Sequence, residues 1–194
     1  MLSSNHVVVL LEREPWISNH VNIQQILEHF DSKETKHLVV NKYKSPDSKG
    51  TYIGRPSPYG NPYPVKAFNN FAVFARNLSV VKHLFYIILN PEVILKIQEE
   101  LKEKELICFC SPLKCHGEIL ALISNDLVQF LSKCSSLTDV QEFPFISESL
   151  NAKVKKNINM VNEELSYRQL NLDNQVNYTS DTGNSLAFKI NDWV

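Results

Sequence analysis

Hydrophobic positions along this chain follow two different periods, which predict short strands and amphipathic helices. Strand-like runs are short, rich in β-branched and aromatic residues and bounded by polar or turn residues: Val7–Leu11, Leu38–Tyr43, Thr51–Ile53 and Leu106–Cys110. Apolar residues recur at helical spacing over residues 21–30, 69–89, 91–104 and 117–131. The order strand, loop, two helices, strand, loop, helix predicts an α/β fold with a small mixed or mostly parallel sheet flanked by helices.

Changes in this pattern divide the chain into three predicted parts. Residues 1–37 read as a strand and helix extension packed on the core, and residues 38–134 as an α/β core domain that carries the candidate site. Residues 135–194 form a linker and an Asn-rich C-terminal appendage. Nine Asn occur in the last 44 residues, and only Ile158–Leu165 resembles a helix there. The appendage is therefore expected to be irregular, either loosely ordered or packed on another surface.

Charge and composition narrow the classes of partner. The formal net charge is -1, but residues 38–134 contain twelve basic and eight acidic residues. This weak positive balance suits a phosphate-bearing small molecule and is too small to predict a nucleic-acid groove. The apolar run His6–Leu11 is too short for a signal segment or membrane span, so no membrane association and a cytoplasmic location are expected.

Residues 54–64 form the most unusual stretch, with four prolines and two glycines in eleven positions. Such a segment predicts a fixed, irregular loop directly after a strand, where α/β folds commonly bind ligands. Arg55 can bind a carboxylate or phosphate with two hydrogen bonds, and Ser57 and Asn61 can add neutral donors. Gly54 and Gly60 allow the backbone to approach a ligand closely. The alternative is a purely structural loop in which Arg55 pairs with a nearby acid.

Four cysteines lie within 27 residues, a clustering that favours metal or thiol chemistry in a reducing compartment over a disulfide framework. Cys108 and Cys110 are predicted to share one face of a strand, while Cys115 and His116 precede a helix, whose N-terminus favours a thiolate.

Three interpretations of this cluster remain open. Cys108, Cys110, Cys115 and His116 supply the ligands for tetrahedral zinc, although adjacent residues are not expected to turn easily toward one ion. Alternatively, Cys110 or Cys115 is a nucleophile with His116 as acid or base, and Glu118 orients His116 or acts as a base. In the third interpretation these are buried structural cysteines.

Four short segments, taken together, are similar to a known family: Tyr52-Ile53-Gly54-Arg55, Gly60-Asn61-Pro62, Cys108-Phe109-Cys110 and Cys115-His116-Gly117. In this order and spacing they resemble the phage and bacterial family catalogued as domain of unknown function 4326, over about residues 38–131. Tyr59 and Phe109 stand where members usually carry Trp, and Glu118 where Asp is usual. The resemblance implies a site but no reaction.

Two functional hypotheses follow. The first is an enzyme that acts on a phosphate-bearing, nucleotide-like small molecule, with Arg55 in the anion loop and the Cys/His centre carrying the chemistry. The second is a non-enzymatic module, stabilised by zinc, that binds a host or phage protein through its termini. A phage origin would place the protein in the host cytoplasm. The sequence does not decide between enzyme and module.

Overall fold

The structure of the protein, a computed structural model, describes residues 2–65 and 71–181. The described residues up to Val161 form one compact unit, and those from Asn162 to Asp181 belong to a second. Within the described residues there are eight α-helices, one short 3-10 helix and three strands. In chain order these are α1 (Ser4–Glu12), η1 (Pro15–Ser18), α2 (His20–His29), α3 (Lys33–Lys36), β1 (Val39–Asn41), β2 (Thr51–Tyr52), α4 (Ala72–Ile88), α5 (Pro91–Leu101), β3 (Leu106–Cys108), α6 (His116–Asn125), α7 (Leu127–Ser136) and α8 (Glu148–Asp181).

The three strands form one parallel sheet in the order β1-β3-β2. Leu106 of the central strand is paired with Val39 on one side and with Thr51 on the other. All three residues of β3 are buried, as expected of a central strand in a parallel sheet. Because the strands are parallel, their carboxyl ends meet at one edge, and the predicted α/β fold with a small parallel sheet is confirmed.

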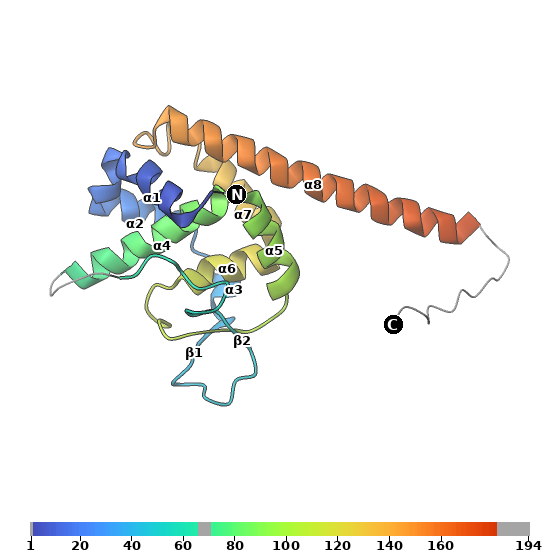
Figure 1. The fold of residues 1–194 in the computed structure, drawn as a ribbon, viewed down its shortest axis with the longest axis horizontal. Helices are drawn as coiled ribbons and strands as arrows, with labels where there is room; N and C mark the ends of the chain where they lie inside the picture. The colour runs from blue at the N-terminus through green and yellow to red at the C-terminus, as the bar shows by residue number, and fades with distance from the viewer. Residues whose placement is uncertain (1, 66–70, 182–194) are drawn as a thin grey trace. The chain divides into compact units, whose positions relative to one another are not determined.

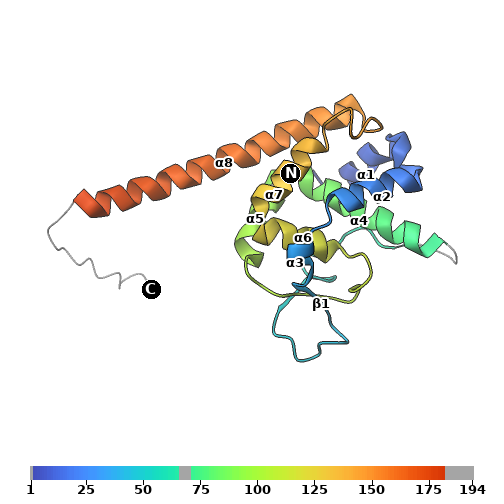
Figure 2. The same cartoon turned by 180° about the vertical axis from the view of Figure 1, so that it is seen from behind.

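Helix α6 packs on β1 and β3 and against α5, and Figure 1 shows the strands beside α6 and α3. The close approach depends on Gly117, because a Cβ there would lie 2.7 Å from Ile53 Cδ1 and 2.9 Å from Val39 Cγ1. The view from behind shows α1 and α2 against α4 (Figure 2). The inner face of α4 carries much of the core, and its Phe85 contacts Trp16 with ring centroids 5.5 Å apart. The site therefore rests on a well-packed support.

The strand predicted over Val7–Leu11 is wrong, because these residues lie in α1. Ser3 caps this helix by accepting a hydrogen bond from the backbone N–H of His6. Val7 and Leu11, one turn apart, are fully buried, and α1 packs on α4. Burial of one helical face therefore overrides the β propensity of the valines.

Helix boundaries elsewhere also differ from the prediction. The helix predicted over residues 117–131 is two helices, α6 and α7, which meet at Asp126; its side chain accepts from Gln129 N at 2.9 Å and starts α7. The helix predicted over residues 69–89 corresponds to α4, which begins at Ala72. Its predicted start at Asn69 lies outside the described residues.

The irregular C-terminal appendage is wrong within the described residues, since α8 continues as a helix to Asp181. Its part in the first unit buries Leu150, Val154, Ile158 and Val161. These residues recur at helical spacing and form an apolar face that the many asparagines obscure in the sequence. Residues 182–194 of the predicted appendage lie outside the described residues.

None of the described helices is by itself long and apolar enough to span a membrane. The bent pair of α4 and α5, at 100° to each other, meets the criterion jointly by length and composition.

Candidate metal and anion site

The candidate site lies at the edge where the carboxyl ends of the strands meet. Ile53 and the proline-rich loop follow β2, and Phe109 and Cys110 follow β3. The segment after β3 then leads into α6, which begins at His116. Parallel strand direction therefore joins the two segments that the sequence singled out.

Cys108, Cys115 and His116 form a buried cluster. Their sulfur atoms and one ring nitrogen all lie within 4.8 Å of one another, and His116 Nδ1 is 3.8 Å from Cys115 Sγ. The other ring nitrogen, Nε2, lies 2.9 Å from the carbonyl oxygen of Ile53. A carbonyl only accepts, so Nε2 carries the hydrogen and Nδ1 presents its lone pair to the sulfur atoms.

Adjacent Cys115 and His116 were not expected to turn easily toward one ion, but their ligand atoms do converge. Cys115 is the N-cap of α6 and has an extended backbone, with φ -134° and ψ 141°, whereas His116 is the first helical residue. This change of backbone conformation between neighbours brings both side chains to the same side. Two residues that would diverge within one regular element therefore converge at a helix start.

Glu118 fixes the position of Cys115. Its Oε1 accepts from the backbone N–H of Cys115 at 3.0 Å, and the Cys115 sulfur accepts from Gly117 N at 3.3 Å, which completes a capping box. Its Oε2 lies 2.9 Å from Lys114 Nζ. Glu118 is not among the residues that line the cavity described below.

Lys114 ties this segment to the turn between α2 and α3. It also pairs with Asp31 at 2.9 Å. Burial by itself would lower the pKa of Lys114, but hydrogen bonds to Asp31 and Glu118 outweigh this effect and raise the pKa. The hydrogen bond from Lys114 in turn lowers the pKa of Asp31. The segment that carries Cys115 is thus anchored by a charged network.

Cys110 lies beyond the end of β3 rather than on it, and its side chain is partly exposed. Hydrogen bonds from Cys108 and Cys115 hold the pKa of the Cys110 thiol well below its usual range, and the charge of Arg76 acts in the same direction. Hydrogen bonds to Cys108 and Cys110, together with burial, raise the pKa of Cys115. The place of Cys115 at a helix start predicts a lowered thiol pKa, whereas its actual surroundings raise the pKa of Cys115 and lower that of Cys110.

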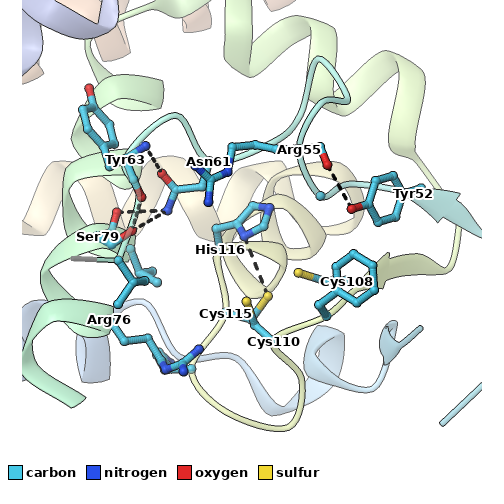
Figure 3. Close-up of a pocket in the computed structure, with 15 residues that line it drawn as sticks. Tyr52, Arg55, Asn61, Tyr63, Arg76, Ser79, Cys108, Cys110, Cys115 and His116 are labelled. Atoms are coloured by element: carbon cyan, nitrogen blue, oxygen red, sulfur yellow. Dashed lines mark hydrogen bonds between the residues drawn. The ribbon is translucent and has the colours of Figure 1, made fainter. Parts of the chain in front are cut away.

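A cavity of about 480 Å³ opens over this cluster. Figure 3 shows the sulfur atoms of Cys108, Cys110 and Cys115 on one side of the His116 ring, with Arg76 extending toward them from α4. Burial lowers the pKa of His116, so its imidazole is neutral. The residues that line the cavity are Tyr52, Gly54, Arg55, Asn61, Tyr63, Val65, Arg76, Ser79, Val80, Cys108, Phe109, Cys110, Lys114, Cys115 and His116.

Some residues of the predicted anion loop line the cavity, and others only support the loop. Gly54, Arg55 and Asn61 line the cavity, whereas Ser57 and Gly60 do not. The amide of Asn61 donates to Ser79 Oγ at 3.0 Å and to Ser79 O at 3.1 Å, so it fixes the loop to α4. A Cβ on Gly60 would lie 2.9 Å from the backbone nitrogen of Arg55, so this glycine permits the turn that presents Arg55.

Arg76 is the residue that the sequence did not mark. It lies in the first turns of a long amphipathic helix, where an arginine is ordinarily a solvated residue. Only the packing of α4 on α6 brings it to the cavity. Within the described residues, neither Arg55 nor Arg76 takes part in an ion pair.

Residues 37–126 match the family model described as Domain of unknown function (DUF4326). This part of the chain is a DUF4326 domain. It contains all three strands, the proline-rich loop and the Cys/His cluster, which confirms the resemblance seen in the motifs. Neither the curated proteins nor the solved structures yield a match. The DUF4326 domain therefore carries a Cys/Cys/His cluster suited to a metal ion, and its description assigns no activity.

Proposed function

We propose that the DUF4326 domain of this protein is a zinc-dependent enzyme that acts on a phosphate-bearing small molecule. Cys108, Cys115 and His116 hold the metal, and Arg55 and Arg76 bind the anionic group beside it. The observation that carries this proposal is the convergence of two sulfur atoms and one imidazole nitrogen within 4.8 Å at the wall of a cavity that also holds two arginines.

The ligand set favours zinc over other common metals. Thiolate and imidazole are the ligands of protein zinc sites, whereas magnesium and calcium prefer oxygen. Tetrahedral zinc places its sulfur and nitrogen ligands about 3.5–3.8 Å apart, and Cys115 Sγ and His116 Nδ1 are 3.8 Å apart. The hydrogen bond from His116 Nε2 to Ile53 O is the outer contact that metal-bound histidines usually make.

Three protein ligands with an open fourth position are characteristic of catalytic zinc. All three ligands line the cavity, so a substrate there would face the metal. A zinc ion with an open position supplies Lewis-acid chemistry to an oxygen of a bound phosphate group. Arg55 and Arg76 supply the planar, paired donors that phosphate oxygens accept.

A second candidate function follows from the position of Cys110. Its sulfur is within hydrogen-bonding reach of Cys108 and Cys115, so it is placed to become a fourth ligand. A site with four protein ligands is closed and structural. In that case the domain is a zinc-stabilised interaction module and not an enzyme.

Metal analysis of the purified full chain tests the proposal. We expect one zinc ion per chain by mass spectrometry of the elements, and its loss in the Cys115→Ser and His116→Ala variants. Cys134→Ala is the matched control, because Cys134 is a fully buried cysteine of α7 outside the cluster. Absence of stoichiometric zinc from the unmodified protein, even after incubation with zinc salts, would overturn the metal centre.

The anion half of the site is tested separately. Inorganic phosphate and ribose 5-phosphate should raise the melting temperature of the zinc-loaded protein, and Arg76→Gln should remove this effect. Arg13→Gln, an equal charge change at the exposed end of α1, is the control. Turnover of a bound compound, followed by ³¹P NMR, should depend on added zinc; a bound compound that is never converted would favour the structural module.

A further inference from the structure

Aromatic side chains gather beside the arginines at the cavity, where the metal and anion hypotheses leave them without a role. Phe109 is 42% exposed and lines the cavity together with Tyr52. The ring centroids of Phe109 and Tyr52 are 5.7 Å apart with an interplanar angle of 76°, and Tyr43 approaches Phe109 at 5.0 Å. Each residue comes from the carboxyl end of a different strand.

This cluster is preformed rather than loosely attached. A hydrogen bond holds the backbone of Phe109 in place, since its carbonyl oxygen accepts from the side-chain amide of Asn41 at 3.0 Å. The ammonium group of Lys42 lies 4.7 Å from the Tyr52 ring centroid and 5.5 Å from that of Phe109. A fixed ring that remains partly exposed is a ready surface for another flat ring, since it loses little conformational entropy on binding.

We propose that the cavity binds a nucleotide, with its base against Phe109 and Tyr52 and its phosphate at Arg55 and Arg76. This inference rests on the proposed function and names the class of its substrate. The cavity joins a ring surface and two guanidinium groups in one volume of about 480 Å³, within the range of about 300–1,000 Å³ for small-molecule sites. A sugar phosphate without a base would leave the aromatic half of the cavity unused.

Calorimetric titration of the zinc-loaded full chain separates the ring from the phosphate. AMP, GMP, CMP and UMP are compared with ribose 5-phosphate, which has the same phosphate and sugar but no base. At least one nucleotide should bind more tightly than ribose 5-phosphate by about fivefold or more, the scale of stacking on one aromatic side chain. Phe109→Leu should abolish this difference and leave the affinity for ribose 5-phosphate unchanged.

Two further variants guard against indirect effects. Phe109→Trp keeps a larger flat ring and should retain the preference for the nucleotide. Phe71→Leu makes the same change at a phenylalanine that is 71% exposed and does not line the cavity, so it should have no effect on any affinity.

Equal affinities for ribose 5-phosphate and all four nucleotides would overturn the nucleotide proposal while the anion site stands. If none of these compounds binds, the anion site of the proposed function fails and the nucleotide proposal fails with it. Tighter binding of a trinucleotide than of every mononucleotide would also overturn it, in favour of a single-stranded nucleic-acid site that extends over Tyr43.

Discussion

His116 donates its Nε2 hydrogen to the carbonyl oxygen of Ile53 at 2.9 Å, and this contact fixes which ring nitrogen faces the cysteines. Ile53 directly follows β2, whereas His116 begins α6, so the hydrogen bond links the proline-rich loop to the metal cluster. The His116 ring therefore contacts both the strand end that leads into the proline-rich loop and the cysteine cluster.

The tautomer of His116 can be measured directly. In ¹⁵N NMR spectra of the labelled protein, Nε2 should carry the hydrogen and Nδ1 should be the nitrogen whose shift changes when zinc is added. Because burial lowers the pKa of His116, its ring should remain neutral to a lower pH than free histidine does. Protonation of Nδ1 in the zinc-loaded protein would contradict the proposed ligand.

A second histidine makes stability depend on pH. His83 is buried, its ring centroid is 5.4 Å from that of His116, and burial holds the pKa of His83 well below its usual value. The folded protein therefore keeps His83 neutral, while the unfolded chain takes up a proton below about pH 6.5. The contribution of His83 to the free energy of unfolding is therefore complete above that pH. As the pH falls further, this contribution is lost by about 1.4 kcal/mol for each pH unit.

Replacement of His83 isolates this contribution. Urea unfolding at pH 7.5 and 5.5 should show a smaller loss of stability for His83→Phe than for the unmodified protein, by about 1.4 kcal/mol. Zinc content measured at both pH values for both proteins shows whether loss of the metal contributes to the difference. Equal losses in the two proteins would show that His83 is already protonated in the fold.

Glu118 is expected to act through Cys115. Glu118→Ala removes the acceptor of the Cys115 N–H and should weaken zinc binding by about tenfold, the lower end of the effect of such outer contacts. Competition with a chromogenic chelator measures this affinity. Asp126→Ala, which removes the N-cap of α7, should cost about 1 kcal/mol of stability without altering zinc affinity. Unchanged zinc affinity but lost turnover in Glu118→Ala would instead indicate a direct role as a base.

Cys110 decides between an open and a closed metal site. In the cobalt-substituted protein, the thiolate-to-cobalt absorption should be unchanged by Cys110→Ser if only Cys108 and Cys115 are bound. If Cys110 is a third thiolate ligand, this absorption should fall by roughly a third. That result would support a closed zinc site with four protein ligands and a structural role. Cys108→Ser gives the size of the change for a lost ligand.

Gly60 should control the anion site without touching the metal. In Gly60→Ala the new methyl group would lie 2.9 Å from both the backbone nitrogen and Cγ of Arg55, so this residue must move. We expect the affinity for ribose 5-phosphate to fall by about fivefold or more, as overpacking typically costs 1–3 kcal/mol. Zinc content should stay at one per chain, and an unchanged affinity would show that Arg55 is not the anion ligand.

Local sequence patterns were sufficient to predict structure where the conformation depends only on neighbouring residues in the chain. Asn19 caps α2 and Pro91 opens α5, because caps and prolines act on their own backbone. The same patterns failed at Val7–Leu11, where packing on α4 makes a helix of a β-rich run. They failed again over α8, where one apolar residue per turn suffices once a surface is available to cover it.

The sequence by itself determined the chemistry of the site. The cysteines, the histidine and the proline-rich loop could be identified from the sequence and assigned to strand ends. Residue types and the order of the strands follow from the local sequence pattern alone. The tertiary structure alone decided that Cys115 and His116 converge, that the surroundings of Cys110 lower the pKa of its thiol, and that Arg76 lines the cavity. These relations are distances between groups on different elements, and they exist only once α4 packs on α6 and α6 packs against the sheet.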